Sequence, residues 1–130
     1  MSPPEITPFL MFEGRAEEAM NLYVELFEGE VVSLLRYGPG EAGAEGSVNQ
    51  ARFRIRGQEI MCIDSPARHA FTFTPSISLF VTCRSEEDLR RLAGALQEGQ
   101  AMMPIDNYGF STLFTWVADR FGVSWQLNLP

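Results

Sequence analysis

Apolar side chains recur along the chain with two different spacings, and each spacing predicts one kind of element. Over residues 15–27 they lie three and four positions apart, which predicts an amphipathic helix. Within residues 48–56, Phe53 and Ile55 alternate with Arg52, Arg54 and Arg56, which predicts a half-buried strand. A second helix is predicted from Ser85, because Asp88 follows three positions later as in a capping box, and Gly99 is expected to end it.

The predicted elements occur twice in the same order. A strand, a helix and three strands follow one another over residues 6–64 and again over residues 76–129. The predicted strands are 6–12, 30–36, 48–56, 59–64, 76–83, 101–104, 112–118 and 124–129. This order predicts an α+β fold, in which two tandem βαβββ modules form a curved mixed sheet around a cleft. Clefts of this kind are where small ligands usually bind.

The length of the chain predicts a single domain. Residues 1–130 match the usual size of one domain, with module one at about residues 6–66 and module two at about residues 76–130. Between two predicted strands of module one, residues 37–47 contain four glycines and a proline, which predicts a flexible loop.

Composition excludes several kinds of partner and chemistry. The net charge of −7 disfavours nucleic acid, whose phosphates need a basic surface. No apolar run approaches the ~18–20 residues of a membrane span, and residues 1–6 lack the features of a signal peptide, so we expect a cytoplasmic protein. The chain has no lysine, which excludes Schiff-base chemistry. Cys62 and Cys83 are expected to be buried, reduced thiols.

Two motifs at the ends of the chain resemble a known family. The opening motif is Ile6-x-Pro-Phe-Leu-x-Phe-x-Gly-x-Ala-x-Glu-Ala-x-x-x-Tyr-x-x-x-Phe27, and the closing motif is Val117-x-Asp119-Arg-Phe-Gly122-Val-x-Trp125-Gln126. Together they resemble the PhnB-like branch of the vicinal oxygen chelate superfamily, which includes glyoxalases, bleomycin resistance proteins and extradiol dioxygenases. Within that branch, the chain is most similar to members described as 3-demethylubiquinone-9 3-methyltransferase-like. The resemblance implies the two-module fold and a homodimer.

The resemblance also implies where a divalent metal would bind in the superfamily. Its four ligand positions fall on Pro8, on Asp64 (or Cys62), on Ser76 and on Gln126. Proline has no side-chain donor, and serine and neutral glutamine are weak ligands, whereas metal sites normally need three or more good ones. The single histidine, His69, matches none of the four positions. We therefore predict no catalytic metal and no cofactor, with a divalent metal possible but disfavoured.

Methyl transfer is not expected, although the branch carries that description. Enzymes that use adenosylmethionine usually bind it at a glycine-rich turn between a strand and a helix. The glycine-rich residues 37–47 lie between two predicted strands instead.

Seven residues are candidates for a ligand-binding cleft: Gln50, Asp64, Ser76, Tyr108, Trp116, Trp125 and Gln126. Each has a purely structural alternative. Asp64 is equally compatible with starting a Ser-Pro turn, the tryptophans with core packing, and Gln50 with a solvated face. His69 is a possible general base but is more simply an exposed loop residue, and Ser65 lacks a nucleophile-elbow context.

Three functions are compatible with these residues. The first is a metal-free, small-molecule-binding or enzyme-like homodimer. The second is a metal-dependent lyase, isomerase or dioxygenase with an unusual ligand set, and the third is a non-catalytic interaction module. The sequence does not identify the small molecule.

Overall fold

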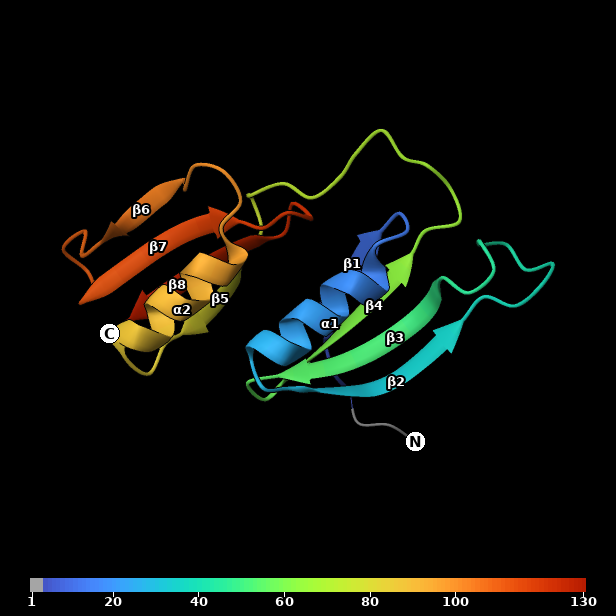
Figure 1. Cartoon of the computed structure of the whole chain (residues 1–130), viewed down its shortest axis with the longest axis horizontal. Helices are drawn as coiled ribbons and strands as arrows, with labels where there is room; N and C mark the ends of the chain where they lie inside the picture. Colours follow the sequence, from blue (N-terminus) through green and yellow to red (C-terminus); the bar gives the residue numbers. More distant parts are fainter. Residues whose placement is uncertain (1–3) are drawn as a thin grey trace. The chain divides into compact units, whose positions relative to one another are not determined.

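A computed structural model describes residues 4–130 of the chain, which divide into two compact units between His69 and Ala70. We call residues up to His69 unit 1 and residues Ala70–Pro130 unit 2. Each unit contains one four-stranded mixed sheet and one helix (Figure 1). The predicted α+β class and the repeated βαβββ order are confirmed, and the single domain over residues 1–130 stays a prediction.

Unit 1 contains one helix and four strands. They are β1 (Phe9–Phe12), α1 (Ala16–Leu26), β2 (Glu30–Arg36), β3 (Val48–Ile55) and β4 (Gln58–Asp64). The strand order in the sheet is β1-β4-β3-β2, with β1 parallel to β4 and the other pairs antiparallel. A tight turn at Arg56 and Gly57, which both have positive φ, joins β3 to β4.

Unit 2 repeats this topology. Its elements are β5 (Leu79–Thr82), α2 (Glu86–Leu96), β6 (Met103–Asp106), β7 (Leu113–Ala118) and β8 (Ser124–Leu129). The strand order is β5-β8-β7-β6, with β5 parallel to β8 and the other pairs antiparallel.

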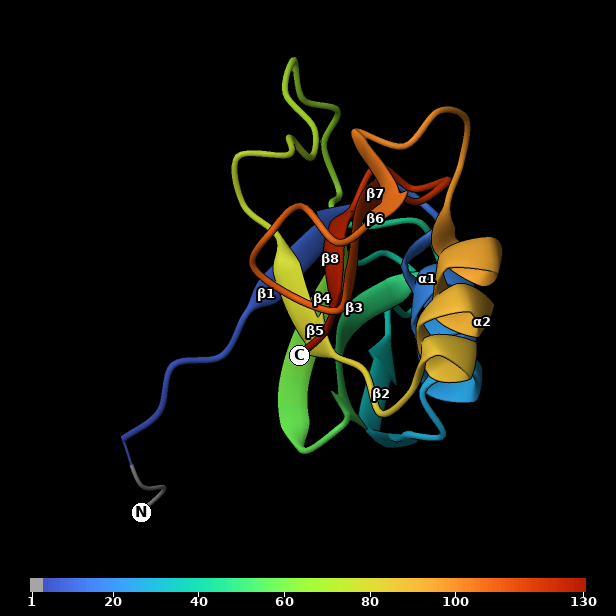
Figure 2. The same ribbon diagram turned by 90° about the vertical axis from the view of Figure 1, so that its left-hand side faces the viewer.

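The core of each unit lies between the helix and one face of the sheet, and the turned view shows α2 on one side of its sheet (Figure 2). In unit 1 the fully buried side chains include Met20 and Tyr23 of α1 with Phe53 and Ile60 of the sheet. In unit 2 they include Leu89, Leu92 and Leu96 of α2 with Val117, Trp125 and Leu127 of the sheet. The predicted helix stripes therefore form the cores.

Three strands begin two or three residues later than predicted. β1 begins at Phe9 rather than at Ile6, whose side chain is 96% exposed and whose segment includes a proline without an N–H. β5 begins at Leu79, three residues later than expected. β6 begins at Met103, and its pairing with β7 is irregular between Met103 and Asp106, as suits an edge strand that contains Pro104.

The two helices begin in different ways. At α2, the Ser85 hydroxyl accepts a hydrogen bond from the backbone N–H of Asp88 (3.1 Å), which confirms the predicted cap. The Asp88 carboxylate accepts from the N–H of Arg84 rather than from that of Ser85. At α1, the capping position holds Arg15, whose side chain makes no capping hydrogen bond. Another part of unit 1 caps α1, as described below.

β2 is the outer strand of its sheet, and most of its side chains are exposed. Its register with β3 shifts twice, between Val31 and Ser33 and between Leu35 and Arg36. Neither α1 nor α2 is long and apolar enough to cross a membrane, and residues 4–130 contain no other helix.

Candidate functional site

A row of hydrogen-bonded polar side chains crosses the sheet of unit 2. The indole N–H of Trp116 donates to the hydroxyl of Ser124 (2.8 Å), and that hydroxyl lies 2.7 Å from the hydroxyl of Ser78. The amide nitrogen of Gln126 donates to the Ser78 hydroxyl (3.3 Å). We call Trp116, Ser124, Ser78 and Gln126 the polar row. Two of its members were predicted cleft residues, and the structure brings them together.

The polar row lies on the face of the sheet opposite α2, which we call the far face. Trp125 and Leu127 of β8 are fully buried with α2, and side chains alternate along a strand, so Ser124 and Gln126 point the other way. Trp116 is the register partner of Gln126 and shares its face. The far face of this sheet therefore carries polar side chains, whereas the face toward α2 carries the apolar side chains of the core.

Aromatic side chains lie on and beside the far face. Phe80 of β5 is the register partner of Gln126 and is 59% exposed. In the loop after β6, the ring of Phe110 packs against that of Phe114 at a centroid distance of 5.0 Å, and the ring of Tyr108 stacks on Phe110 at 6.2 Å. The predicted candidate Tyr108 thus belongs to an aromatic cluster, in which Phe110 is 62% exposed. Exposed rings beside hydrogen-bonding groups suit a flat organic ligand.

One buried acceptor on the far face has no donor. Asn128 follows Gln126 by two positions on β8 and so shares its face. Its side-chain oxygen is buried and accepts no hydrogen bond from residues 4–130. A buried polar atom without a partner costs about 1–3 kcal/mol, so orphaned groups of this kind often mark functional positions.

Trp125 is a core residue and does not line the far face. Its side chain is 0% exposed, and its indole N–H donates to Asp119 (2.9 Å). The other carboxylate oxygen of Asp119 accepts from the backbone N–H groups of Phe121 and Val123. The closing motif therefore forms the β7–β8 turn around the buried carboxylate of Asp119. Trp125 packs in the core, which was the alternative to a position in the cleft.

Asp64 has the structural role that was its alternative interpretation, and it also belongs to the lining of an open pocket in unit 1. It is buried, and one carboxylate oxygen accepts from the N–H of Gly14 (2.8 Å) and of Ala16 (2.9 Å). The other oxygen accepts from the N–H of Val48 (3.0 Å). Register places the carboxylate there, because Asp64 lies on the α1 side of β4 and a shift of one residue would exchange the two faces.

Ser76 and Gln50 are not members of the polar row. Ser76 precedes β5 in an exposed loop, and its hydroxyl lies 2.6 Å from that of Thr74. Ser78, two residues further along, is the serine that contacts Gln126 and Ser124. Gln50 lies in unit 1 on β3, exposed and paired in register with Leu35 of the outer strand.

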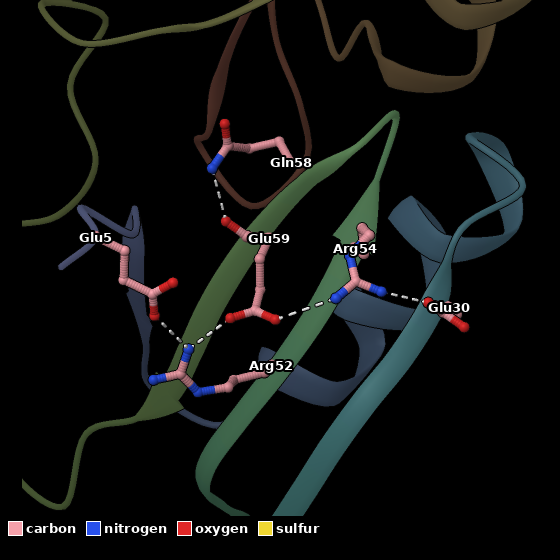
Figure 3. A network of polar contacts seen from close by, with 6 residues as sticks. All are labelled: Glu5, Glu30, Arg52, Arg54, Gln58 and Glu59. Carbon is pink, nitrogen blue, oxygen red and sulfur yellow. Dashed lines mark hydrogen bonds and ion pairs between the residues drawn. The ribbon is translucent and has the colours of Figure 1, made fainter. Parts of the chain in front are cut away.

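Ion pairs occupy the face of the first sheet opposite α1 (Figure 3). Arg52 contacts Glu5 (3.5 Å) and Glu59 (2.5 Å), and Arg54 contacts Glu59 (3.5 Å) and Glu30 (2.5 Å). Each arginine thus lies between two carboxylates, so this network offers no unpaired positive charge to an anionic ligand.

The side chains do not fit the metal site that the resemblance implies. Asp64 is fully engaged by backbone N–H groups, and Gln126 offers only a neutral amide. Cys62 is buried on the α1 side, where burial, and to a smaller extent the nearby Asp64, raises its pKa to about 12 and so disfavours the thiolate that metals bind. Within residues 4–130, no three His, Cys, Asp or Glu side chains gather closely enough to hold a metal ion. We therefore derive no chemistry through a metal.

Sequence reasoning missed Ser78, Ser124 and Asn128. Strand alternation was the available signal for Ser124 and Asn128, because both lie two positions from Gln126 and so share its face. Ser78 could be found only once the beginning of β5 was known.

Comparison with known proteins identifies the family. The family model described as 3-demethylubiquinone-9 3-methyltransferase matches residues 4–128. The chain is 52% identical to a PhnB protein from Bacillus cereus, with a TM-score of 0.93 over 98% of this chain and 100% of that one. It is 27% identical to protein PA1353 from Pseudomonas aeruginosa, with a TM-score of 0.84 over 98% of each chain.

A more distant structure shares the fold. The glyoxylase/bleomycin resistance protein/dioxygenase domain from Frankia sp. is 16% identical, with a TM-score of 0.62 over 98% of this chain and 93% of that one. The chain therefore belongs to the 3-demethylubiquinone-9 3-methyltransferase family, in its PhnB-like branch.

Proposed function

We propose that this protein binds a small, flat organic molecule on the far face of the unit 2 sheet, and that it does so without a resident metal ion. The observation that carries the proposal is the polar row, in which Gln126 and Trp116 are held by two serine hydroxyls beside the exposed ring of Phe80. A protein face that only needed to be solvated would not require this arrangement of buried and half-buried donors and acceptors.

Each part of the site supports one feature of the ligand. Phe80 and Trp116 offer flat apolar surface for a ring. The amide oxygen of Gln126 accepts no hydrogen bond from residues 4–130, so it is available to a ligand donor. A planar ring that carries an N–H or O–H group matches these contacts best.

Methyl transfer is not the reaction that we propose, although it appears in the family's description. The glycine-rich residues 37–47 join β2 to β3 rather than a strand to a helix, so they do not form the turn at which adenosylmethionine usually binds. The homodimer stays a prediction, and sedimentation at micromolar concentration tests it.

The test is a titration of the purified protein with benzamide, which combines a ring with an amide N–H, followed by ligand-observed NMR. We expect saturable binding that Gln126→Ala weakens about fivefold, the effect of one hydrogen bond worth roughly 1 kcal/mol. Gln97→Ala is the matched control, because Gln97 is an exposed glutamine at the end of α2 and should bind benzamide like the wild type.

Two other outcomes would replace the proposal. Elemental analysis that finds one divalent ion per chain, lost in Gln126→Ala, would indicate a metal-dependent lyase, isomerase or dioxygenase with an unusual ligand set. Absence of saturable binding by benzamide and by a set of aromatic fragments would indicate an interaction module without a small ligand.

A further inference from the structure

An open pocket of about 480 Å³ lies in unit 1. Its wall includes Glu13 from the turn before α1, Ser47 from the end of the glycine-rich loop, and Ser65 and Arg68 from the loop after β4. These segments meet where β1 and β4, two parallel strands, both end. The carboxyl ends of parallel strands are a common location for ligand sites in mixed sheets.

Within this loop, Ser65 and His69 form a side-chain pair. The Ser65 hydroxyl oxygen lies 2.7 Å from Nε2 of the imidazole, and both residues are partly exposed. The same hydroxyl oxygen accepts a hydrogen bond from the backbone N–H of Ala67 (3.2 Å). While it accepts from Ala67, the hydroxyl can still donate its own proton to Nε2, and it does so when the imidazole is neutral with its proton on Nδ1. This is the arrangement of a serine nucleophile and its general base.

The backbone around Ser65 is firmly held. The N–H of Ser65 donates to the carbonyl of Phe12 (2.7 Å), which extends the pairing of β1 and β4 by one residue. The preceding residue, Asp64, is fixed by three backbone N–H groups through its side chain and by the Tyr37 hydroxyl through its carbonyl (3.0 Å). Ser65 therefore projects from a rigid strand end, as a preorganised nucleophile needs.

Arg68 supplies positive charge on the same wall. Among residues 4–130, no carboxylate lies within ion-pair distance of its guanidinium, and it makes no side-chain hydrogen bond. A guanidinium close to a nucleophile can stabilise the oxyanion that forms when the nucleophile attacks a carbonyl carbon.

We propose that Ser65 is an acyl-accepting nucleophile, with His69 as its general base and Arg68 as the cation that faces the oxyanion. The Ser65 oxygen attacks the carbonyl carbon of a small ester, so that a new O–C bond forms and the bond to the leaving alcohol breaks. Nε2 of His69 takes the hydroxyl proton and passes it to the leaving oxygen, and the alcohol leaves neutral. A water molecule then hydrolyses the acyl-serine, which releases the acid and restores the hydroxyl.

The test uses two probes on the full chain. A fluorophosphonate forms a stable adduct with activated serines, and peptide mapping by mass spectrometry identifies the labelled residue. Hydrolysis of p-nitrophenyl acetate measures turnover. We expect a single adduct on Ser65, no adduct in Ser65→Ala, and a decrease of about 100-fold in both rates in His69→Ala, the usual contribution of a general base.

Ser76→Ala provides the matched control. Its hydroxyl is also hydrogen-bonded, but to Thr74 rather than to an imidazole, so this variant should react like the wild type. An adduct on any other residue, or equal rates in wild type and Ser65→Ala, would overturn the proposal. Hydrolysis that survives in Ser65→Ala but is lost in His69→Ala would also overturn it, because the imidazole would then be the nucleophile. Mapping of the wild-type adduct does not depend on the folding of any variant.

Discussion

The carboxylate of Asp64, the last residue of β4, lies 2.9 Å from the backbone nitrogen of Ala16, the first residue of α1. A residue far along the chain thus provides the cap that Arg15 cannot provide, and it places a negative charge at the positive end of the helix. The same carboxylate accepts from Val48, so it also fixes the end of the glycine-rich loop. Asp64 thus joins the beginnings of α1 and β3 to the end of β4.

Asp64→Asn should destabilise the protein by about 1–3 kcal/mol. The amide can accept from Gly14 and Ala16 through its oxygen, but its NH₂ group would then face the N–H of Val48, which leaves buried donors without an acceptor. The free energy of unfolding from urea titration measures the change. Asp106→Asn is the control, since that carboxylate is exposed and should change stability by less than about 0.5 kcal/mol. Equal effects of the two substitutions would contradict the capping role.

The two tryptophans should differ in their contribution to stability. Trp125→Phe leaves a cavity in the core and deprives the buried Asp119 of a donor, so we expect a loss of about 2–4 kcal/mol. Trp116→Phe removes only the hydrogen bond to Ser124 from a partly exposed ring and should cost about 1 kcal/mol. Urea unfolding of both variants gives the comparison, and a larger loss for Trp116→Phe would contradict the assignment of Trp125 to the core.

The element order could be predicted from the sequence because apolar residues recur with the period of the helix or strand whose face is buried. The stripes that include Tyr23 and Leu92 are those that the helices bury. The closing motif was also visible, but its role was not, because Asp119 and Trp125 meet only once the β7–β8 turn has formed. Sequence patterns record which faces are buried more clearly than they record which side chains touch.

The candidate site could be predicted only in part, because side-chain faces depend on where each strand begins. Gln126 and Trp116 were expected, since β8 and β7 lie close to their predicted positions. Because β5 begins three residues later than predicted, the serine that contacts Gln126 is Ser78 and not the expected Ser76. The pair of Ser65 and His69 depends on a loop conformation, which has no repeating pattern to reveal it.

Cys62 should be unreactive in the folded protein. Burial, followed by the charge of Asp64, raises the pKa of this thiol from 9.0 to about 12, so at pH 8 only about one thiol in ten thousand is ionised. An aromatic disulfide reagent should modify Cys62 in the Cys83→Ala variant only after denaturant is added. Rapid modification of the native variant at pH 8 would contradict the burial of this thiol.

The same pKa predicts a dependence of stability on pH. The unfolded thiol ionises near pH 9 while the folded one stays neutral, so the free energy of unfolding should decrease as the pH rises from about 9 toward 12. The decrease should be smaller in Cys62→Ala, which has no thiol at this position. Urea unfolding at pH 8 and pH 10 measures the difference, and identical pH dependence of the two proteins would argue against it.

The ion-pair network on the first sheet should contribute little and should depend on salt. Arg52→Ala removes contacts to Glu5 and Glu59, but both arginine and glutamates are partly exposed, so we expect a loss of about 0.5–1 kcal/mol at low ionic strength. The loss should diminish in 1 M NaCl, where charges are screened beyond about 3 Å. A double-mutant cycle with Glu59→Ala isolates the pair, and a coupling energy that is unchanged by salt would contradict an electrostatic origin.

The irregular outer strand β2 affects how the protein behaves among copies of itself. Val31, Val32 and Leu35 are exposed on an edge whose backbone N–H and C=O groups could pair with another chain. Two register shifts bend and twist this edge, so that it is a poor template for a regular added strand. The register shifts of β2 therefore oppose fibre-like aggregation through an edge that exposes apolar side chains.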